Sequence, residues 1–150
     1  MSLKNNSKIT ACLWCKENAL EKAEYYCSIF PNSQILSQHP AIVAFELDGN
    51  KFQALNGGVD FEYNESISFV VDCDGQKEVD YYWDKFILDG GEAMDCSWLK
   101  DKYGMRWQIV PRQLAELMMD GDSEKAGRVM QAMMKMQKII VADLEKAYKG

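Results

Sequence analysis

A seven-residue motif, called the repeated phrase below, occurs twice in this chain. It constrains the fold more than any other feature. The first copy is residues 49–55, Gly-Asn-Lys-Phe-Gln-Ala-Leu, and the second is residues 104–110, Gly-Met-Arg-Trp-Gln-Ile-Val. Both copies read glycine, any residue, a base, an aromatic residue, glutamine and two apolar residues. A repeat with a period of about 50 residues indicates that one supersecondary unit is present twice.

Each copy of the phrase predicts a glycine turn followed by a strand with two different faces. Successive side chains of a strand point to opposite sides, so the aromatic residue and the glutamine lie on opposite faces. We expect the aromatic face to enter the core, and the two matching glutamines to line one pocket shared by both halves. The two faces are Lys51, Gln53 and Leu55 against Phe52 and Ala54, and Arg106, Gln108 and Val110 against Trp107 and Ile109.

Length, charge and cysteine content limit the class of protein. A chain of 150 residues is predicted to form a single domain, residues 1–150, that buries about 70% of its unfolded surface. A nucleic-acid-binding surface is basic and clustered, so the net charge of −6 and pI near 4.8 argue against nucleic acid as a partner. No apolar run approaches the roughly 20 residues of a membrane helix, which argues against a membrane partner. Five scattered cysteines predict reduced thiols and a cytoplasmic protein.

The same order of elements is predicted around each copy of the phrase. A β-prone run precedes an amphipathic helical pattern in each half, and short strands follow that pattern. The sequence therefore predicts an α+β fold in which two βαβββ modules, residues 8–56 and 66–111, form a curved mixed sheet with an open face. The predicted strands include residues 9–14, 42–47, 66–71 and 97–100, and the helical patterns are residues 19–30 and 79–87, with residues 57–64 as the joint.

Residues 112–150 have no counterpart in the first half and predict a helical C-terminal extension. The helices are expected at residues 113–119, 123–136 and 141–148, with Asp122 or Ser123 as the N-cap of the second. Met130, Met133 and Met134 share one helical face. We expect this face to pack on the sheet or on a second subunit; the alternative is an adaptable lid over a pocket.

Five stretches of the chain carry a resemblance to a known family. They are residues 30–33 (Phe-Pro-Asn-Ser), 54–58 (Ala-Leu-Asn-Gly-Gly), 67–71 (Ile-Ser-Phe-Val-Val), 98–104 (Trp-Leu-Lys-Asp-Lys-Tyr-Gly) and 128–133 (Arg-Val-Met-Gln-Ala-Met). Together with the paired modules, they resemble the PhnB-like branch of the glyoxalase/bleomycin-resistance/dioxygenase (vicinal oxygen chelate) superfamily. Sequences of this branch often carry the label 3-demethylubiquinone-9 3-methyltransferase. The resemblance runs from about Ile9 to Tyr148.

The resemblance implies a metal position that this sequence does not fill. In the metal-dependent relatives, His, Gln and Glu near the start of the first strand and on the last strand of each module hold a divalent ion. The matching positions here are Thr10 or Ala11, Ser66, Gln53 or Ala54, and Gln108. A set without a carboxylate or an imidazole holds a dication poorly, and the sole histidine, His39, falls outside it. We therefore expect no metal.

Two classes of function remain open. The first is a small-molecule-binding protein without metal or cofactor, in which Trp14 stacks on the ligand and Gln53, Gln108 and Arg106 make polar contacts. The second is an enzyme, either a metal-assisted lyase, isomerase or dioxygenase, or the methyltransferase of the family label. No glycine-rich strand–helix turn for S-adenosylmethionine is found, because Gly57-Gly58 and Gly90-Gly91 read as tight turns of another architecture.

The candidate pocket residues follow from alternation along the predicted strands. Because superfamily members of this size commonly dimerise, we expect a homodimer with its ligand pocket near the module or subunit interface. Cys12 and Cys15 form a CxxC on a strand, so their thiols should diverge and form no redox pair. The candidate pocket residues are Thr10, Cys12, Trp14, Glu46, Gln53, Ser66, Ser68, Arg106 and Gln108.

Overall fold

The computed structural model describes residues 7–150 and divides the chain into two compact units. The first unit ends at Glu62, and the second begins at Tyr63. This division falls within the predicted joint, so each unit contains one copy of the repeated phrase. Among the described residues, none of the helices is both long and apolar enough to cross a bilayer.

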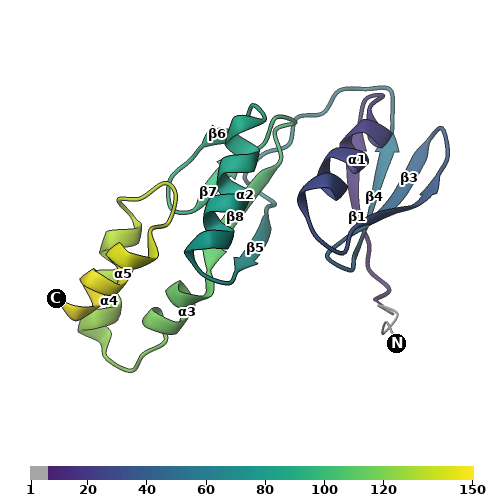
Figure 1. Ribbon diagram of the computed structural model, residues 1–150. Helices are drawn as coiled ribbons and strands as arrows, with labels where there is room; N and C mark the ends of the chain where they lie inside the picture. Colours follow the sequence, from purple (N-terminus) through teal and green to yellow (C-terminus); the bar gives the residue numbers. More distant parts are fainter. Residues whose placement is uncertain (1–6) are drawn as a thin grey trace. The chain divides into compact units, whose positions relative to one another are not determined.

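The first unit is a βαβββ module with one helix on one face of a four-stranded sheet (Figure 1). The sheet order is β1-β4-β3-β2, in which β1 runs parallel to β4 and the other neighbours are antiparallel. We call the face of each sheet opposite to its helix the open face. The elements are β1 (Ala11–Cys15), α1 (Ala19–Ile29), β2 (Gln34–Gln38), β3 (Ile42–Leu47) and β4 (Asn50–Asn56).

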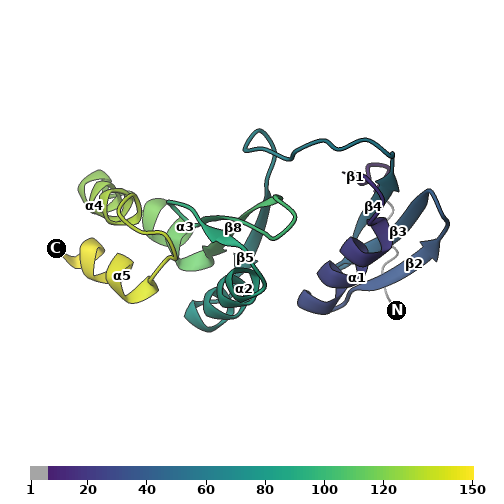
Figure 2. The same ribbon diagram turned by 90° about the horizontal axis from the view of Figure 1, so that it is seen from above.

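The second unit repeats this module and adds three helices. Its sheet order is β5-β8-β7-β6, with β5 parallel to β8 and the other neighbours antiparallel. The α+β prediction of two βαβββ modules with a helical extension is thus confirmed, and each module has a four-stranded mixed sheet of its own. The helices of the extension lie beside the second module (Figure 2). The elements are β5 (Phe69–Cys73), α2 (Gln76–Leu88), β6 (Glu92–Ala93), β7 (Trp98–Lys100), β8 (Arg106–Pro111), α3 (Arg112–Met118), α4 (Ser123–Met133) and α5 (Val141–Lys149).

The first strand of each module begins later than the sequence pattern predicts, and local side-chain hydrogen bonds explain why. The second module's strand begins at Phe69 instead of residue 66, because the backbone N–H of Ser66 donates to Asn64 Oδ1 at 2.9 Å in a turn. The first begins at Ala11 instead of residue 9, where the N–H of Ile9 donates to Ser7 Oγ at 3.3 Å. Asn and Ser side chains of this kind compete with strand pairing for the backbone.

The aromatic face of the repeated phrase lies in the core of both modules, as predicted. Phe52 is buried and stacks on Phe45 with ring centroids 5.5 Å apart. Trp107 is 3% exposed and stacks on Phe86 of α2 at 5.1 Å. The glutamine that follows each aromatic residue is half-buried on the open face.

The three helices of the tail pack around a small core of their own and are also fixed to α2 by polar contacts. The side chain of Gln76 accepts from Val141 N at 2.7 Å and donates to Ile139 O at 3.0 Å. Lys138 Nζ forms ion pairs with Asp80 at 2.8 Å and Asp84 at 3.1 Å. The tail core consists of Leu114, Val129, Ile139 and Leu144, with Val110, Met133 and Met136 among the side chains packed against it.

Helices α4 and α5 begin at the predicted residues and α3 begins one residue early, at Arg112. The methionine face of the tail has two environments. Asp122 caps α4, since its side chain accepts from the backbone N–H groups of residues 124 and 125. The helix ends at Met133 instead of residue 136, and a turn follows in which Met136 N donates to Met133 O. Met133 packs against the tail core, whereas Met130 and Met134 are exposed.

Candidate functional site

The two glutamines of the repeated phrase occupy equivalent places on the two open faces. In the second module Gln108 of β8 lies in register between Val70 of β5 and Trp98 of β7. In the first module Gln53 of β4 lies in register between Cys12 of β1 and Ala44 of β3. The repeat therefore extends to the pairing of individual residues, which gives each open face a central amide.

On the second module, two of the predicted pocket residues, Ser68 and Gln108, are in direct contact. Gln108 Nε2 of β8 donates to the Oγ atom of Ser68, the residue directly before β5, at 2.9 Å. This bond fixes the orientation of the Gln108 amide. Val70 is 60% exposed beside it, so the centre of this open face combines an oriented amide with an accessible apolar side chain.

Arg106 lies on the same face, but its guanidinium is already engaged by the chain that enters the module. Its Nη2 atom donates to Glu65 Oε1 at 2.8 Å, and its Nη1 atom donates to Tyr63 O at 3.3 Å. The hydrogen bond from Arg106 lowers the pKa of the Glu65 carboxyl below its usual value. Lys51, the base of the first copy, likewise reaches Ser7 O at 3.5 Å. In both modules, the basic residue of the repeated phrase thus binds the segment that leads into the first strand of the module.

Trp14, which we expected to stack on a ligand, is covered by the joint. Its indole Nε1 donates to Val59 O at 2.7 Å, and its ring centroid lies 5.1 Å from that of Phe61. The ring also lies directly over Gly57, where an added Cβ would come within 1.9 Å of the indole carbon Cζ2. Only glycine fits at this position, and residues of the joint therefore pack against the indole.

The remaining predicted residues do not form one cluster. Glu46 accepts a hydrogen bond from Gln34 Nε2 at 2.7 Å on the first open face, and Cys12 is exposed next to Gln53. Thr10 is exposed just before β1, and Ser66 lies in the turn before β5. The first open face therefore carries Cys12, Glu46 and Gln53, and the second carries Ser68, Arg106 and Gln108.

Two residues of the second module are important in the structure and were missed in the sequence. Trp98 faces the open side, and the signal that could have placed it is the alternation with the fully buried Leu99.

Asp101 is 2% exposed, and no local pattern distinguishes it from a surface carboxylate. Its Oδ1 atom accepts from Tyr103 N at 2.9 Å and Met105 N at 3.0 Å. Its Oδ2 atom accepts from the indole Nε1 of Trp107 at 2.9 Å.

The metal site of the superfamily does not fit the residues found here. Within residues 7–150, no group of three or more His, Cys, Asp or Glu side chains is arranged to hold an ion. The positions equivalent to metal ligands provide hydroxyl and amide groups, which bind divalent transition metals weakly without an anionic or imidazole partner. We therefore derive no chemical step that uses a metal.

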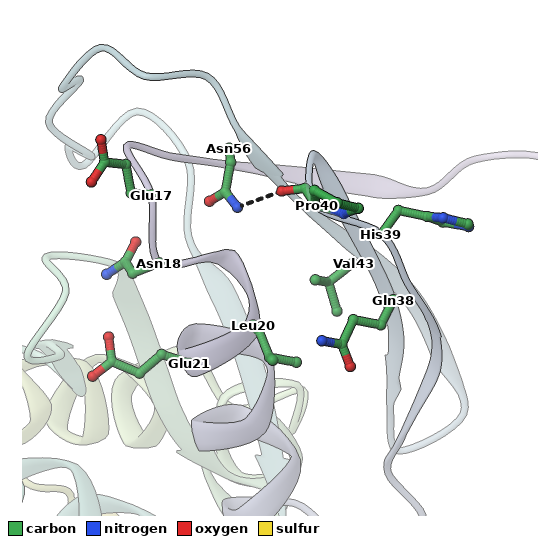
Figure 3. Close-up of a pocket in the computed structure, with 9 residues that line it drawn as sticks. All are labelled: Glu17, Asn18, Leu20, Glu21, Gln38, His39, Pro40, Val43 and Asn56. Carbon is green, nitrogen blue, oxygen red and sulfur yellow. Dashed lines mark hydrogen bonds between the residues drawn. The ribbon is translucent and has the colours of Figure 1, made fainter.

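A hollow of about 540 Å³ lies in the first unit, beside the start of α1 (Figure 3). Asn56 joins its walls, because its Oδ1 atom accepts from Ala19 N at 2.9 Å and its Nδ2 atom donates to Pro40 O at 3.0 Å. In Figure 3 the carboxylates of Glu17 and Glu21 point away from the hairpin side of the hollow. The lining residues are Glu17, Asn18, Leu20, Glu21, Gln38, His39, Pro40, Val43 and Asn56. Because the charged groups do not converge, we favour the open face of the second module as the site.

The cysteines of the CxxC diverge, as predicted, which gives a test by thiol labelling. Cys12 is exposed, whereas Cys15 is 2% exposed in the core. Burial raises the pKa of the Cys73 thiol to about 12, so Cys73 carries little thiolate at neutral pH. A maleimide reagent should label Cys12 quickly, and Cys15 and Cys73 only after unfolding, as read by peptide mass spectrometry. Equal labelling rates at Cys12 and Cys15 would contradict this placement.

Comparisons with known proteins agree with the geometry. A family model described as 3-demethylubiquinone-9 3-methyltransferase matches residues 7–110. A putative 3-demethylubiquinone-9 3-methyltransferase (PhnB protein) from Bacillus cereus is 28% identical, with a TM-score of 0.63 over 70% of this chain and 99% of that one. The fosfomycin resistance protein FosX from Listeria monocytogenes is 14% identical, with a TM-score of 0.54 over 70% of this chain and 92% of that one.

A third similar structure and the extent of the matches complete the comparison. A glyoxalase-related enzyme from Fulvimarina pelagi is 13% identical, with a TM-score of 0.50 over 70% of this chain and 88% of that one. No curated protein matches the chain. The family match ends at residue 110, so the tail stretch 128–133 lies beyond it. Because the FosX and Fulvimarina structures share little sequence identity with this chain, their similarity supports the fold alone.

Proposed function

The chain belongs to the family described as 3-demethylubiquinone-9 3-methyltransferase, and from that premise we propose that it binds a small molecule without a metal ion. Within the glyoxalase/bleomycin-resistance superfamily it is a PhnB-like member. The observation that carries the proposal is the row Val70, Gln108 and Trp98 on the second open face. Small-molecule sites combine apolar and aromatic side chains with a few placed polar groups, and this row contains both kinds.

A thermal-shift screen tests this proposal directly. The screen includes metabolites, divalent metals with and without EDTA, and S-adenosylmethionine, since the family description names methyl transfer. A true ligand raises the melting temperature in proportion to RT ln(1 + [L]/Kd). We expect at least one organic metabolite to do so, with no effect of EDTA.

Two variants locate the binding face in the same screen. Gln108→Ala should reduce the shift that the metabolite causes, because it removes the central amide of the second open face. Gln131→Ala on α4 changes an exposed glutamine elsewhere in the same unit and should leave the shift intact. A shift caused by metal or S-adenosylmethionine alone would favour the enzyme class instead. A metabolite shift unaffected by Gln108→Ala would place the site elsewhere.

We also infer that the protein forms a homodimer in the cytoplasm. Met119 and Met134 in the tail are exposed apolar side chains, and two-fold pairing is the commonest way to cover such surface. The free thiols fit a reducing compartment. Light scattering at micromolar concentration should report about twice the chain mass of 17.2 kDa. A monomer at all micromolar concentrations would rule out the dimer.

A further inference from the structure

The turn that leads into β7 has an unusual backbone that the tail holds in place. Cys96 and Ser97 are consecutive non-glycine residues with φ of 58° and 76°, a left-handed region that costs energy for side chains with a Cβ. Cys96 N donates to Met136 O at 2.8 Å, and Ser97 N donates to Gln137 O at 3.0 Å. These two bonds from the tail stabilise the strained turn.

The residue that directly follows this turn is Trp98. It is half-buried on the open face, opposite the fully buried Leu99 and in register with Gln108. Within residues 7–150 its indole N–H makes no hydrogen bond, whereas the indole N–H of Trp14 is bound to Val59 and that of Trp107 to Asp101. Trp98 therefore offers a ring surface and a hydrogen-bond donor beside the oriented amide.

We propose that Trp98 is the aromatic contact of the ligand site and that the tail positions it through the Cys96–Ser97 turn. This proposal rests on the proposed function and names a ligand class for it: a planar ring compound with a hydrogen-bond acceptor. The ring stacks on the indole, and the acceptor receives the indole N–H. Val70, exposed on the other side of Gln108, contacts the apolar edge of the ligand. Tryptophan suits this role because it combines a large apolar ring with a polar N–H.

Nuclear magnetic resonance of the ¹⁵N-labelled chain tests the contact with a matched pair of probes. Acetophenone and cyclohexyl methyl ketone share the carbonyl acceptor, but only acetophenone has a planar ring. Acetophenone should shift the indole N–H signal of Trp98 saturably and bind about fivefold tighter than the saturated ketone. Trp98→Leu should weaken acetophenone binding about tenfold. Tyr81→Leu, which changes an exposed aromatic residue on α2 away from the open face, should leave it unchanged.

The outcomes separate this inference from the proposed function. If acetophenone shifts the side-chain amide of Gln108 while Trp98→Leu binds equally well, the open face binds ligands and the role of Trp98 is wrong. Equal affinity for the two ketones overturns the planar ligand class. If neither ketone shifts either signal, the Trp98 inference is overturned, and small-molecule binding then depends on the metabolite screen.

The role of the tail has its own readout. Lys138→Met removes the ion pairs with Asp80 and Asp84 that hold the tail on α2. The backbone N–H groups of Cys96 and Ser97 should then exchange with solvent faster, and acetophenone affinity should fall about threefold. Lys146→Met, an exposed change on α5, is the control. Unchanged exchange and affinity in Lys138→Met would show that the tail does not position Trp98.

Discussion

Replacement of Trp107 by alanine is expected to lower the free energy of unfolding by roughly 3–5 kcal/mol, the cost of comparable large-to-small core changes. The side chain is 3% exposed, stacks on Phe86 and lies 5.4 Å from Phe69 between ring centroids. Alanine leaves a cavity between the second sheet and α2, and it also removes the indole donor to Asp101. Both losses act on the same part of the core, so the effect should be large.

Chemical denaturation followed by circular dichroism measures this effect, and the neighbouring residue provides the control. Gln108→Ala alters the next position of the same strand on the opposite, half-buried face. It should cost much less, because the one side-chain hydrogen bond that it removes is to Ser68 near solvent. Equal losses for the two variants would contradict the assignment of the two faces.

Much of the fold could be predicted from the sequence because the strand period of two leaves few choices. In each copy of the phrase an aromatic residue stands next to a glutamine, so a shift of one residue would bury the amide and expose the ring. The burial of Phe52 and Trp107 follows from this pattern alone. The starts of β1 and β5 were less predictable, because single side chains such as Ser7 and Asn64 bind the backbone that the strand would use.

The candidate site was harder to predict because its side chains depend on contacts between distant parts of the chain. Trp14 and Arg106 both lie on open faces, as alternation predicts. However, Trp14 is bound to Val59, 45 residues away, and Arg106 is bound to Glu65, 41 residues away. No periodic pattern encodes such pairs, so the sequence could not show that these two side chains bind Val59 and Glu65. Their contact with a ligand stays a prediction. That both modules and the tail form one domain stays a prediction.

Replacement of Asp101 by alanine should also destabilise the protein, by roughly 3–5 kcal/mol, although the residue is a carboxylate in a turn. The change leaves the backbone N–H groups of Tyr103 and Met105 and the indole N–H of Trp107 without their acceptor. Each unsatisfied buried donor costs about 1–3 kcal/mol. Asp101→Asn keeps one carbonyl oxygen but places N–H groups against these donors, so an intermediate loss is expected.

A double-mutant cycle with Trp107→Phe separates the indole contact from the two backbone contacts of Asp101. Phenylalanine keeps a ring over Phe86 but has no donor for Asp101 Oδ2. In the Trp107→Phe background, Asp101→Ala should therefore cost about 1–2 kcal/mol less than in the native chain, and this difference is the coupling between the two side chains. Urea denaturation of all four proteins gives the value. A coupling near zero would show that Asp101 acts only on the backbone of the turn, and a loss below about 1 kcal/mol for Asp101→Ala itself would mean that water replaces its three hydrogen bonds.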